Sequence, residues 1–260
     1  MKLDGMHALV TGASHGIGID IARRLTAKGA RVTVTGRDKA RTTGVAEQLG
    51  AQAVVADLAD EAQLATVVAD AEALNGPLDL LINNAAVALV ASARESKPGQ
   101  AAELMTVNAV APMELCRQAL PGMLARGRGY LVNVSSLAGV SAVPDMPIYC
   151  ASKAALHHYT SVLERELART PVNVLLATFG EVAGTRMMEE SRESEVISAV
   201  SRRLAKALPT QNTEDVARQL IAAVERDASI VTIPRRMGAV VALRNLPSTL
   251  GDLAYIGIKR

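Results

Sequence analysis

The sequence predicts an α/β fold in three layers, a single doubly wound parallel sheet with helices on both faces. Two observations predict it: short apolar runs of strand length alternate with stretches of helical periodicity, and no Gly/Ser/Pro-rich linker divides the 260 residues. Hydrophobic residues make up 49% of the chain, enough for one sizeable core, while aromatic residues make up 2%, so aliphatic side chains must do the packing. We therefore expect one domain.

A glycine-rich turn near the N-terminus predicts a phosphate-binding site. Residues 7–10 form a short apolar run typical of a buried strand, and residues 19–28 have helical periodicity. A strand that turns through glycines into a helix directs backbone N–H groups and the positive end of the helix dipole toward a pyrophosphate. The glycine spacing is Gly-x-x-x-Gly-x-Gly, and the alternative is a tight turn that binds nothing. The candidate cofactor-binding residues of this turn are Gly12, Ser14, His15, Gly16, Ile17 and Gly18.

Two later strands also end in polar residues. Residues 80–82 lead into Asn83 and Asn84, and residues 130–136 end in a pair of serines. Ligands of open α/β sheets bind at the carboxyl ends of the strands. The two carboxamides can therefore either tie neighbouring loops together or meet a cofactor, and Asn84 and Ala85 are candidate cofactor contacts.

Tyr149 and Lys153 form the most informative pair in the chain. They lie four residues apart in a run that predicts a helix, so both side chains leave the same helix face, one turn apart. An adjacent cation favours the phenolate, so we expect Lys153 to lower the pKa of Tyr149 and to make it a proton donor and acceptor near neutral pH. A Tyr-x-x-x-Lys match is weak alone, but the motifs upstream of it make it specific.

Together these motifs resemble those of the short-chain dehydrogenase/reductase family, over residues 6–185 and in the expected order. The resemblance implies a Rossmann-type fold and an NAD(P)-dependent oxidoreductase that interconverts a carbonyl and an alcohol by hydride transfer. It also implies four catalytic residues. Ser136 would polarise the carbonyl, Tyr149 would be the general acid/base, and Lys153 would tune Tyr149 and hold the nicotinamide ribose. Asn108 would support a proton-relay water, and its alternative role is to kink or cap a helix.

The residues that follow the second predicted strand, 31–35, favour NADP(H) over NAD(H). Glycine at the strand tip, Gly36, leaves room, and Arg37 supplies the charge that a 2′-phosphate needs. Asp38 stands near the position of the acidic residue of NAD-binding proteins, but we expect it to cap the next helix. The resemblance adds His15, at a position where NADP-using relatives often carry arginine or lysine. The alternatives are NAD(H) as the cofactor and a solvent-facing His15.

The resemblance implies further cofactor contacts at the ends of the third and sixth strands. Asp57, with Leu58 beside it, ends the third strand, and Asp57 would hydrogen-bond the adenine amino group. At the end of the sixth strand the chain departs from the family pattern, because Phe179 replaces the usual proline. Phe179 either packs on the sheet or floors the nicotinamide pocket. Val182 and Thr185 are the candidates for contact with the nicotinamide carboxamide.

The last third of the chain contains a predicted substrate lid and an unusual tail. Mixed charge over about 186–210 indicates a mobile lid, and an amphipathic helix over 213–227 and a strand over 230–233 follow. We expect one dinucleotide-binding domain over 1–234, with an apolar and basic extension of the same domain over 235–260. Charged residues and a proline interrupt this extension, so it cannot be a simple transmembrane helix. It either lies on an anionic membrane surface or packs across the substrate cleft or a neighbouring subunit.

Composition and cysteine usage argue against several other classes. The net charge is +2 and aromatic residues are few, so no nucleic-acid surface is expected. Cys116 and Cys150 form no metal or disulfide pattern, and adjacent His157 and His158 would point in different directions on a helix, so no metal site is expected. The first strand begins near residue 7, which leaves no room for a signal peptide. We therefore expect a reducing cytoplasm.

The predicted function is an NADP(H)-dependent oxidoreductase that acts on a hydrophobic ketone, aldehyde or alcohol with Tyr149 as general acid/base. The hydrophobic substrate is inferred from the apolar tail and the aliphatic lid. By resemblance, helices within residues 100–126 and 151–169 would pair in a homodimer or homotetramer. The alternatives are an NAD-dependent alcohol dehydrogenase of the same family and a non-catalytic dinucleotide-binding sensor or scaffold, which the presence of all four catalytic residues disfavours.

Overall fold

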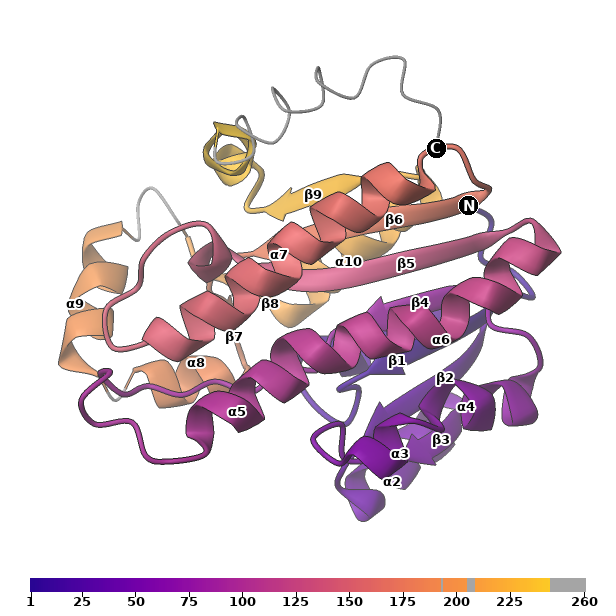
Figure 1. Cartoon of the computed structure of the whole chain (residues 1–260), viewed down its shortest axis with the longest axis horizontal. Helices are drawn as coiled ribbons and strands as arrows, with labels where there is room; N and C mark the ends of the chain where they lie inside the picture. The colour runs from indigo at the N-terminus through magenta and orange to yellow at the C-terminus, as the bar shows by residue number, and fades with distance from the viewer. Residues whose placement is uncertain (193, 205–208, 244–260) are drawn as a thin grey trace.

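The computed structural model describes residues 1–192, 194–204 and 209–243, and over these residues it contains a seven-stranded parallel sheet (Figure 1). The strand order β3-β2-β1-β4-β5-β6-β9 confirms the doubly wound topology, because successive strands run outward from β1 in both directions. The direction reverses between β1 and β4, where sheets of this kind receive ligands. The strands of this sheet are β1 (His7–Thr11), β2 (Arg31–Gly36), β3 (Gln52–Val55), β4 (Leu80–Asn83), β5 (Gly129–Ser136), β6 (Val172–Phe179) and β9 (Ile230–Ile233).

Helices cover both faces of the sheet, which completes the three predicted layers (Figure 1). The α-helices are α1 (Ile17–Ala27), α2 (Lys39–Leu49), α3 (Glu61–Leu64), α4 (Val67–Asn75), α5 (Gln100–Met105), α6 (Ala111–Arg126), α7 (Pro147–Leu167), α8 (Arg186–Ser191), α9 (Glu195–Leu204) and α10 (Thr213–Glu225). A π-helical segment, η1 (Thr106–Val110), joins α5 to α6, and η2 (Leu137–Gly139) and η3 (Arg235–Met237) are 3-10 turns.

Alternate residues of a central strand point to opposite faces of the sheet, as the pleat requires. In β1, Ala8 and Val10 belong to the apolar cluster on one face and Leu9 belongs to the cluster on the other. The first cluster includes buried residues of α1, α2 and α10, and the second includes buried residues of α4, α6 and α7. Aliphatic side chains dominate both clusters, so the composition predicted the character of the core correctly.

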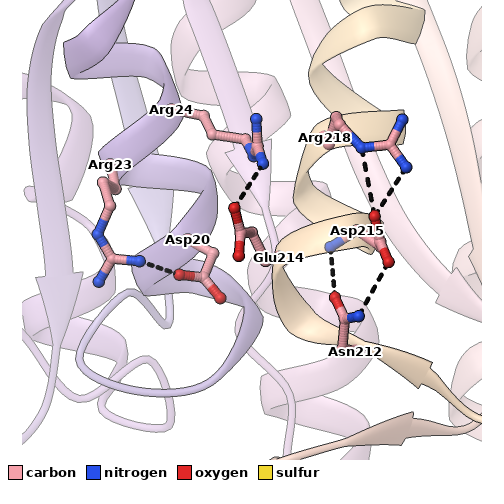
Figure 2. Close-up of polar contacts among 7 residues, drawn as sticks. All are labelled: Asp20, Arg23, Arg24, Asn212, Glu214, Asp215 and Arg218. Atoms are coloured by element: carbon pink, nitrogen blue, oxygen red, sulfur yellow. Dashed lines mark hydrogen bonds and ion pairs between the residues drawn. The ribbon is translucent and has the colours of Figure 1, made fainter.

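The pair α1 and α10 shows what holds helices on the first face. Their apolar sides face the sheet, and Ile21 of α1 and Leu220 of α10 are fully buried. Polar contacts lie on the exposed sides of the two helices (Figure 2). Arg24 of α1 pairs with Glu214 of α10 at 3.2 Å, and within α10 the carboxylate of Asp215 accepts from Arg218 at 2.7 Å. Because exposed ion pairs contribute little to stability, the buried apolar faces must supply most of this packing energy.

The predicted elements match the observed ones, with shifts at their ends. Asp38 caps α2 as predicted, since its carboxylate accepts from the backbone N–H of Arg41 (3.0 Å). The helix carrying Tyr149 begins earlier than residue 151, at Pro147. The long helix expected over 100–126 is continuous but contains the π-helical turn η1. The hydrophobic periodicity of the sequence does not reveal a π-helical turn, because the one residue that the turn adds changes the helical period only locally.

The segment expected to be a lid contains α8 and α9, and it is flanked by a small sheet of β7 (Val182–Ala183) and β8 (Gln211–Asn212). The expected extension over 235–260 begins with η3 and a helical run over 238–243, where Val241 is buried beside β9. The rest of that extension lies outside the described residues. In the part of the chain that the structure describes, no helix is long and apolar enough to cross a membrane.

Candidate active site

Helix α7 carries Tyr149 and Lys153 on its buried face, next to the end of β5. Pro147 begins this helix, a position that suits a residue with no N–H to donate. The helix packs closely on turn η2, because a Cβ on Gly139 would lie 2.8 Å from the carbonyl oxygen of Lys153. The hydroxyl of Ser135 donates to the same carbonyl oxygen (3.1 Å). These two contacts fix the register of α7 against β5, and therefore the position of Tyr149.

Burial governs the protonation of Tyr149 and Lys153, which are 5% and 2% exposed. The ammonium of Lys153 lies 6.0 Å from the centroid of the Tyr149 ring and donates to the carbonyl oxygen of Val134 (3.0 Å). Burial raises the pKa of Tyr149 to about 12, although hydrogen bonding to Ser136 opposes the rise, and burial lowers the pKa of Lys153 to about 8. The expected fall in the pKa of Tyr149 is therefore wrong for the protein alone, because the loss of solvation on burial raises this pKa.

Ser136 and Asn108 approach the same region from other elements. Ser136 ends β5, and its hydroxyl accepts from the backbone N–H of Ala138 (3.1 Å). Asn108 lies in η1 and is fully buried. Its side chain accepts from the N–H of Val87 (2.8 Å) and donates to the carbonyl oxygen of Val87 (2.8 Å) and to Ser152 (3.0 Å). The Asn108 amide thus braces the loop after β4 against α7, and Asn108 itself lies in a π-helical turn.

The glycine-rich turn joins β1 to α1 as predicted. Gly12 and Gly16 have φ values of 66° and 60°, in the left-handed region that glycine adopts without strain. A Cβ on Gly18 would lie 2.3 Å from the carbonyl oxygen of Gly12, so Gly18 allows α1 to pack closely on the turn. No side chain of the described residues caps α1 at Gly16. The first N–H groups of this helix are therefore suited to bind an anion.

The loop after β4 closes over the glycine-rich turn. The side-chain amide of Asn84 donates to the carbonyl oxygens of Thr11 (3.0 Å) and Gly12 (3.3 Å). The backbone N–H groups of Asn84 and Ala85 both donate to the Thr11 hydroxyl at 3.0 Å. Asn83 is instead buried in the core. Of the two roles considered for the carboxamides, tying loops together is the one that these hydrogen bonds perform.

A cleft of about 600 Å³ opens between these loops and the lid. Most of the predicted cofactor contacts line it, namely Gly12, Ser14, His15, Gly16, Ile17, Arg37, Asp57, Leu58, Asn84, Ala85 and Thr185. The others, Gly18, Val182, Tyr149 and Lys153, lie outside this lining. Val87, Ala88 and Met187 line the cleft and also pack against the apolar cluster that contains Tyr149. One end of the cleft therefore leads to Tyr149.

Sequence reasoning missed two arginines of the cleft, Arg41 in the first turn of α2 and Arg186 at the start of α8. Burial and then the charges of Arg41, Arg186 and Arg37 lower the pKa of His15, and all three arginines line the cleft with this histidine. The expected start of α2 beside the second strand tip could have revealed Arg41. Arg186 follows the departure from the family pattern at Phe179, so no motif pointed to it.

That departure places Phe179 and Val182 in the core. Both belong to the apolar cluster on the α1 and α10 face, and they are 4% and 6% exposed. Phe179 thus packs on the sheet, the first of its two considered roles. Val182 pairs with Gln211 of β8, and its carbonyl oxygen accepts from the hydroxyl of Thr185 (2.8 Å). Thr185 lines the cleft and caps α8 by accepting from the N–H of Met188 (3.2 Å).

An apolar cluster surrounds Tyr149. It joins the loop after β4, the segment before α7 and the two lid helices, and every side chain in it other than the Tyr149 phenol and the Cys150 thiol is aliphatic or a methionine. Its members besides Tyr149 are Leu104, Ala138, Met146, Ile197, Val87, Ala88, Leu89, Val90, Val143, Ile148, Cys150 and Met187. A substrate that reaches Tyr149 must therefore pass through or displace an aliphatic surface.

The fold and the cleft define a dinucleotide-binding α/β protein in which Tyr149 and Lys153 are buried beside the cleft. The chain belongs to the short-chain dehydrogenase/reductase family, because the family model described as short chain dehydrogenase matches residues 6–196. It is therefore an NAD(P)-dependent oxidoreductase, and the alternative of a non-catalytic sensor or scaffold is not supported.

Named relatives and solved structures agree with this assignment. The chain is 33% identical to the ketoacyl reductase HetN of Nostoc sp. over 84% of this chain and 80% of that protein, and 34% identical to an uncharacterized oxidoreductase of Staphylococcus saprophyticus over 70% and 80%. A metagenomic short-chain oxidoreductase solved in complex with NADP is 32% identical, with a TM-score of 0.72 over 90% of this chain and 98% of that one. A short-chain dehydrogenase/reductase from Burkholderia phymatum, solved in complex with NAD, is 25% identical, with a TM-score of 0.79 over 96% of both chains.

Proposed function

We propose that this protein is an NADP(H)-dependent oxidoreductase that interconverts a hydrophobic ketone or aldehyde and the corresponding alcohol, with Tyr149 as general acid/base. The observation that carries the proposal is the placement of Tyr149 and Lys153, buried on α7 beside Ser136, where an arginine-rich cleft meets an aliphatic cluster. An NAD-dependent alcohol dehydrogenase of the same family is the second candidate.

The residues of the cleft fit a dinucleotide. The uncapped N-terminus of α1 would hold the diphosphate, and Asp57 with Leu58, at the end of β3, would hold the adenine. Lys153 would hold the nicotinamide ribose, and Thr185, which lies over Gly16, the carboxamide end. Val182 would contribute through its backbone, because its side chain is in the core.

NADP(H) fits the adenosine end of the cleft better than NAD(H). Arg37 and Arg41 line this end beside Gly36. A Cβ on Gly36 would lie 2.8 Å from the hydroxyl oxygen of Thr42 and 3.0 Å from that of Ser14, so the glycine makes room for these two side chains. Guanidinium groups pair well with a phosphate. Asp38, the candidate acidic residue for a ribose 2′-hydroxyl, is already engaged in capping α2 and in an ion pair with Arg41 (3.3 Å). The similarity to a solved relative that binds NADP supports the same choice.

The chemistry follows from the groups around the reacting carbonyl. When bound, the nicotinamide supplies the hydride, or accepts it in the oxidising direction. Ser136 and Tyr149 would donate hydrogen bonds to the oxygen on which negative charge grows, and Tyr149 would pass its proton to that oxygen. With a pKa of about 8, Lys153 is mostly protonated at neutral pH, and its charge would stabilise the phenolate that Tyr149 becomes. Asn108 would act by holding the loop after β4 in place.

The substrate is proposed to be hydrophobic because the surface around Tyr149 is aliphatic. The lid contributes Met187 and Ile197 to this surface, so α8 and α9 would move to admit a substrate. The similarity to a protein named ketoacyl reductase supports a carbonyl substrate.

We also propose that the protein acts in the cytoplasm as a homodimer or homotetramer. Exposed Val110 between α5 and α6 and exposed Val162 on α7 lie on the helices expected to pair, and subunit contact would bury them.

A cofactor titration followed by a substrate screen tests the proposal. The chain contains no tryptophan, so the fluorescence of NADPH and NADH can be followed on binding without that background. We expect NADPH to bind more tightly and to reduce at least one ketone in a panel of steroids, quinones and acyl thioesters. Tighter binding of NADH would overturn the cofactor assignment. Tight binding without turnover of any substrate would overturn the proposed chemistry.

A further inference from the structure

Arg186 is a cation of the lid that lies on the wall of the cofactor cleft. It is the first residue of α8, and it lines the same cleft as Ser14, His15 and Gly16 of the glycine-rich turn. Its neighbour Thr185 lies so close to the turn that a Cβ on Gly16 would be 3.6 Å from the methyl group of Thr185. The start of α8 is thus held over the part of the turn that precedes α1.

The guanidinium of Arg186 is paired within its own helix. It donates to the carboxylate of Glu190, one turn later, at 2.7 Å, and Glu190 lines the cleft as well. The Arg186 side chain is 71% exposed and the Glu190 side chain 39% exposed. An exposed ion pair of this kind is weak, so an anion that enters the cleft can compete with Glu190 for the guanidinium.

The charge of Arg186 acts on the glycine-rich turn. Burial, and after it the charges of Arg41, Arg186 and Arg37, lower the pKa of His15, and all four residues line the same cleft. Arg37 and Arg41 belong to the tips of β2 and α2, at the adenosine end of the cleft. Arg186 belongs instead to the lid, next to the N-terminus of α1. The tips of β2 and α2 therefore bring positive charge to one part of the cleft, and α8 brings it to another.

From this arrangement, and resting on the proposed binding of a dinucleotide, we propose that Arg186 is a positioning residue that binds the cofactor diphosphate and so couples the lid to the cofactor. On binding, the guanidinium leaves Glu190 for a diphosphate oxygen, while the N-terminus of α1 holds the other side of the group. This exchange draws the start of α8 onto the cofactor. The lid helices carry Met187 and Ile197, which pack against the Tyr149 cluster, so cofactor binding orders the wall of the substrate site.

The assignment separates Arg186 from the arginines of the adenosine end. A diphosphate is common to NADPH and NADH, whereas a 2′-phosphate is present in NADPH alone. Loss of Arg186 must therefore weaken the binding of both cofactors by the same factor, and loss of Arg37 or Arg41 must weaken the binding of NADPH alone.

Titration of both cofactors into Arg186→Gln tests the proposal, with Arg192→Gln as the matched control. Arg192 is exposed at the carboxyl end of the same helix and lies outside the cleft lining. We expect Arg186→Gln to raise the dissociation constants of NADPH and NADH by about tenfold each, the effect of one lost charge-assisted hydrogen bond. Their ratio should stay at the wild-type value. Glu190→Gln should tighten both cofactors, because it frees the guanidinium, and Arg192→Gln should change neither.

Hydrogen exchange of the lid gives a readout that does not depend on activity. In the wild type and in Arg192→Gln, NADPH should protect the backbone amides of α8, and in Arg186→Gln this protection should be lost at cofactor saturation. Unchanged affinities with unchanged protection in Arg186→Gln would overturn the inference and leave the proposed function intact. Weakening of NADPH alone would also overturn it, since Arg186 would then contact the 2′-phosphate. Failure of the wild type to bind either cofactor would overturn the proposed function and the inference with it.

Discussion

The two ends of the sheet both bury ionisable side chains, but they satisfy them differently. At the amino ends of the strands, the ring nitrogens of fully buried His7 lie 2.7 Å from the carbonyl oxygen of Gly76 and 2.9 Å from the hydroxyl of Thr33. The carboxylate of Asp79 accepts from Arg128 (2.9 Å) and from the backbone N–H of His7 (3.1 Å). Each buried group there has partners of matching chemistry within the chain.

At the carboxyl ends, Tyr149 and Lys153 are as deeply buried, yet burial disfavours the charged form of both. Burial also lowers the pKa of His7, so a shifted pKa is common to both ends. What distinguishes the carboxyl ends is that their buried pair lies next to the cleft, where a shifted pKa is suited to chemistry on a ligand, whereas satisfied polar groups away from a cleft contribute to stability. The comparison therefore predicts that substitutions at the carboxyl ends change activity and leave stability alone, and that substitutions at the amino ends do the reverse.

The largest effect expected is that of Tyr149→Phe. It removes the proton donor and keeps the ring that packs in the aliphatic cluster, so turnover should fall by about 1,000-fold, within the range for loss of a general acid. Cofactor affinity and the thermal midpoint should match those of the wild type. Tyr159→Phe is the control, because it makes the same change on the same helix but on the side that packs against the other apolar cluster. Activity in Tyr149→Phe close to that of this control would refute the catalytic role.

At the amino ends, Asp79→Asn should lower the stability of the fold and leave the turnover number unchanged, the opposite of Tyr149→Phe. The Asp79 side chain is 1% exposed, and the substitution removes the charge that faces Arg128 and one of two acceptors. Urea unfolding should show a loss of about 1–3 kcal/mol, the cost of a poorly satisfied buried group. The turnover number at temperatures below the transition should be unchanged. A large fall in turnover with unchanged stability would contradict the division between the two ends.

The fold and the placement of the candidate catalytic residues could be predicted from sequence because they depend on local patterns. Strand length, glycine positions and the spacing of Tyr149 and Lys153 are set by neighbours in the chain, and the structure places them as expected. The alternation of strands and helices predicts a parallel sheet with helices on both faces, and the observed sheet is of this kind. Features that depend on neighbours in the chain can thus be predicted from the sequence.

What could not be predicted depends on contacts between distant segments. The pKa of Tyr149 was expected to fall, but it rises, because its burial comes from the lid and from the loop after β4, far away in sequence. Arg186 enters the cleft only because the pairing of β7 with β8 places α8 over the glycine-rich turn. The amide of Asn108 braces Val87 through a π turn that has no sequence signature.

Cofactor choice offers a smaller test of the carboxyl ends. Arg37→Gln and Arg41→Gln should each raise the dissociation constant of NADPH by about tenfold and leave that of NADH unchanged, because each removes one cation beside the 2′-phosphate. Lys39→Gln is the matched control, since it removes a charge from the same turn of α2 outside the cleft lining. Stability should not change in any of them. An equal rise in the dissociation constants of NADPH and NADH would show that these arginines do not bind the 2′-phosphate.

The smallest effect expected is the pH dependence of stability from His7. The amide of Asn75 donates to the Thr33 hydroxyl (2.9 Å), so this hydroxyl can donate to Nε2 of His7 while Nδ1–H donates to Gly76. This chain of donors requires the neutral ring, and burial lowers the pKa of His7 below its ordinary value of 6.5.

Because the folded-state pKa is depressed, the unfolded chain binds the proton first. The contribution of His7 to stability is therefore complete above pH 6.5 and is lost as the pH falls below it, with a slope of at most about 1.4 kcal/mol per pH unit for one proton. Unfolding measured at successive pH values should show a flatter profile below pH 6.5 in His7→Gln than in the wild type. His158→Gln, which replaces an exposed histidine of α7, is the control and should keep the His7 slope. If His7→Gln retained the wild-type profile, the donor chain at the amino ends would not control protonation, and the contrast between the two ends would then rest on Asp79 alone.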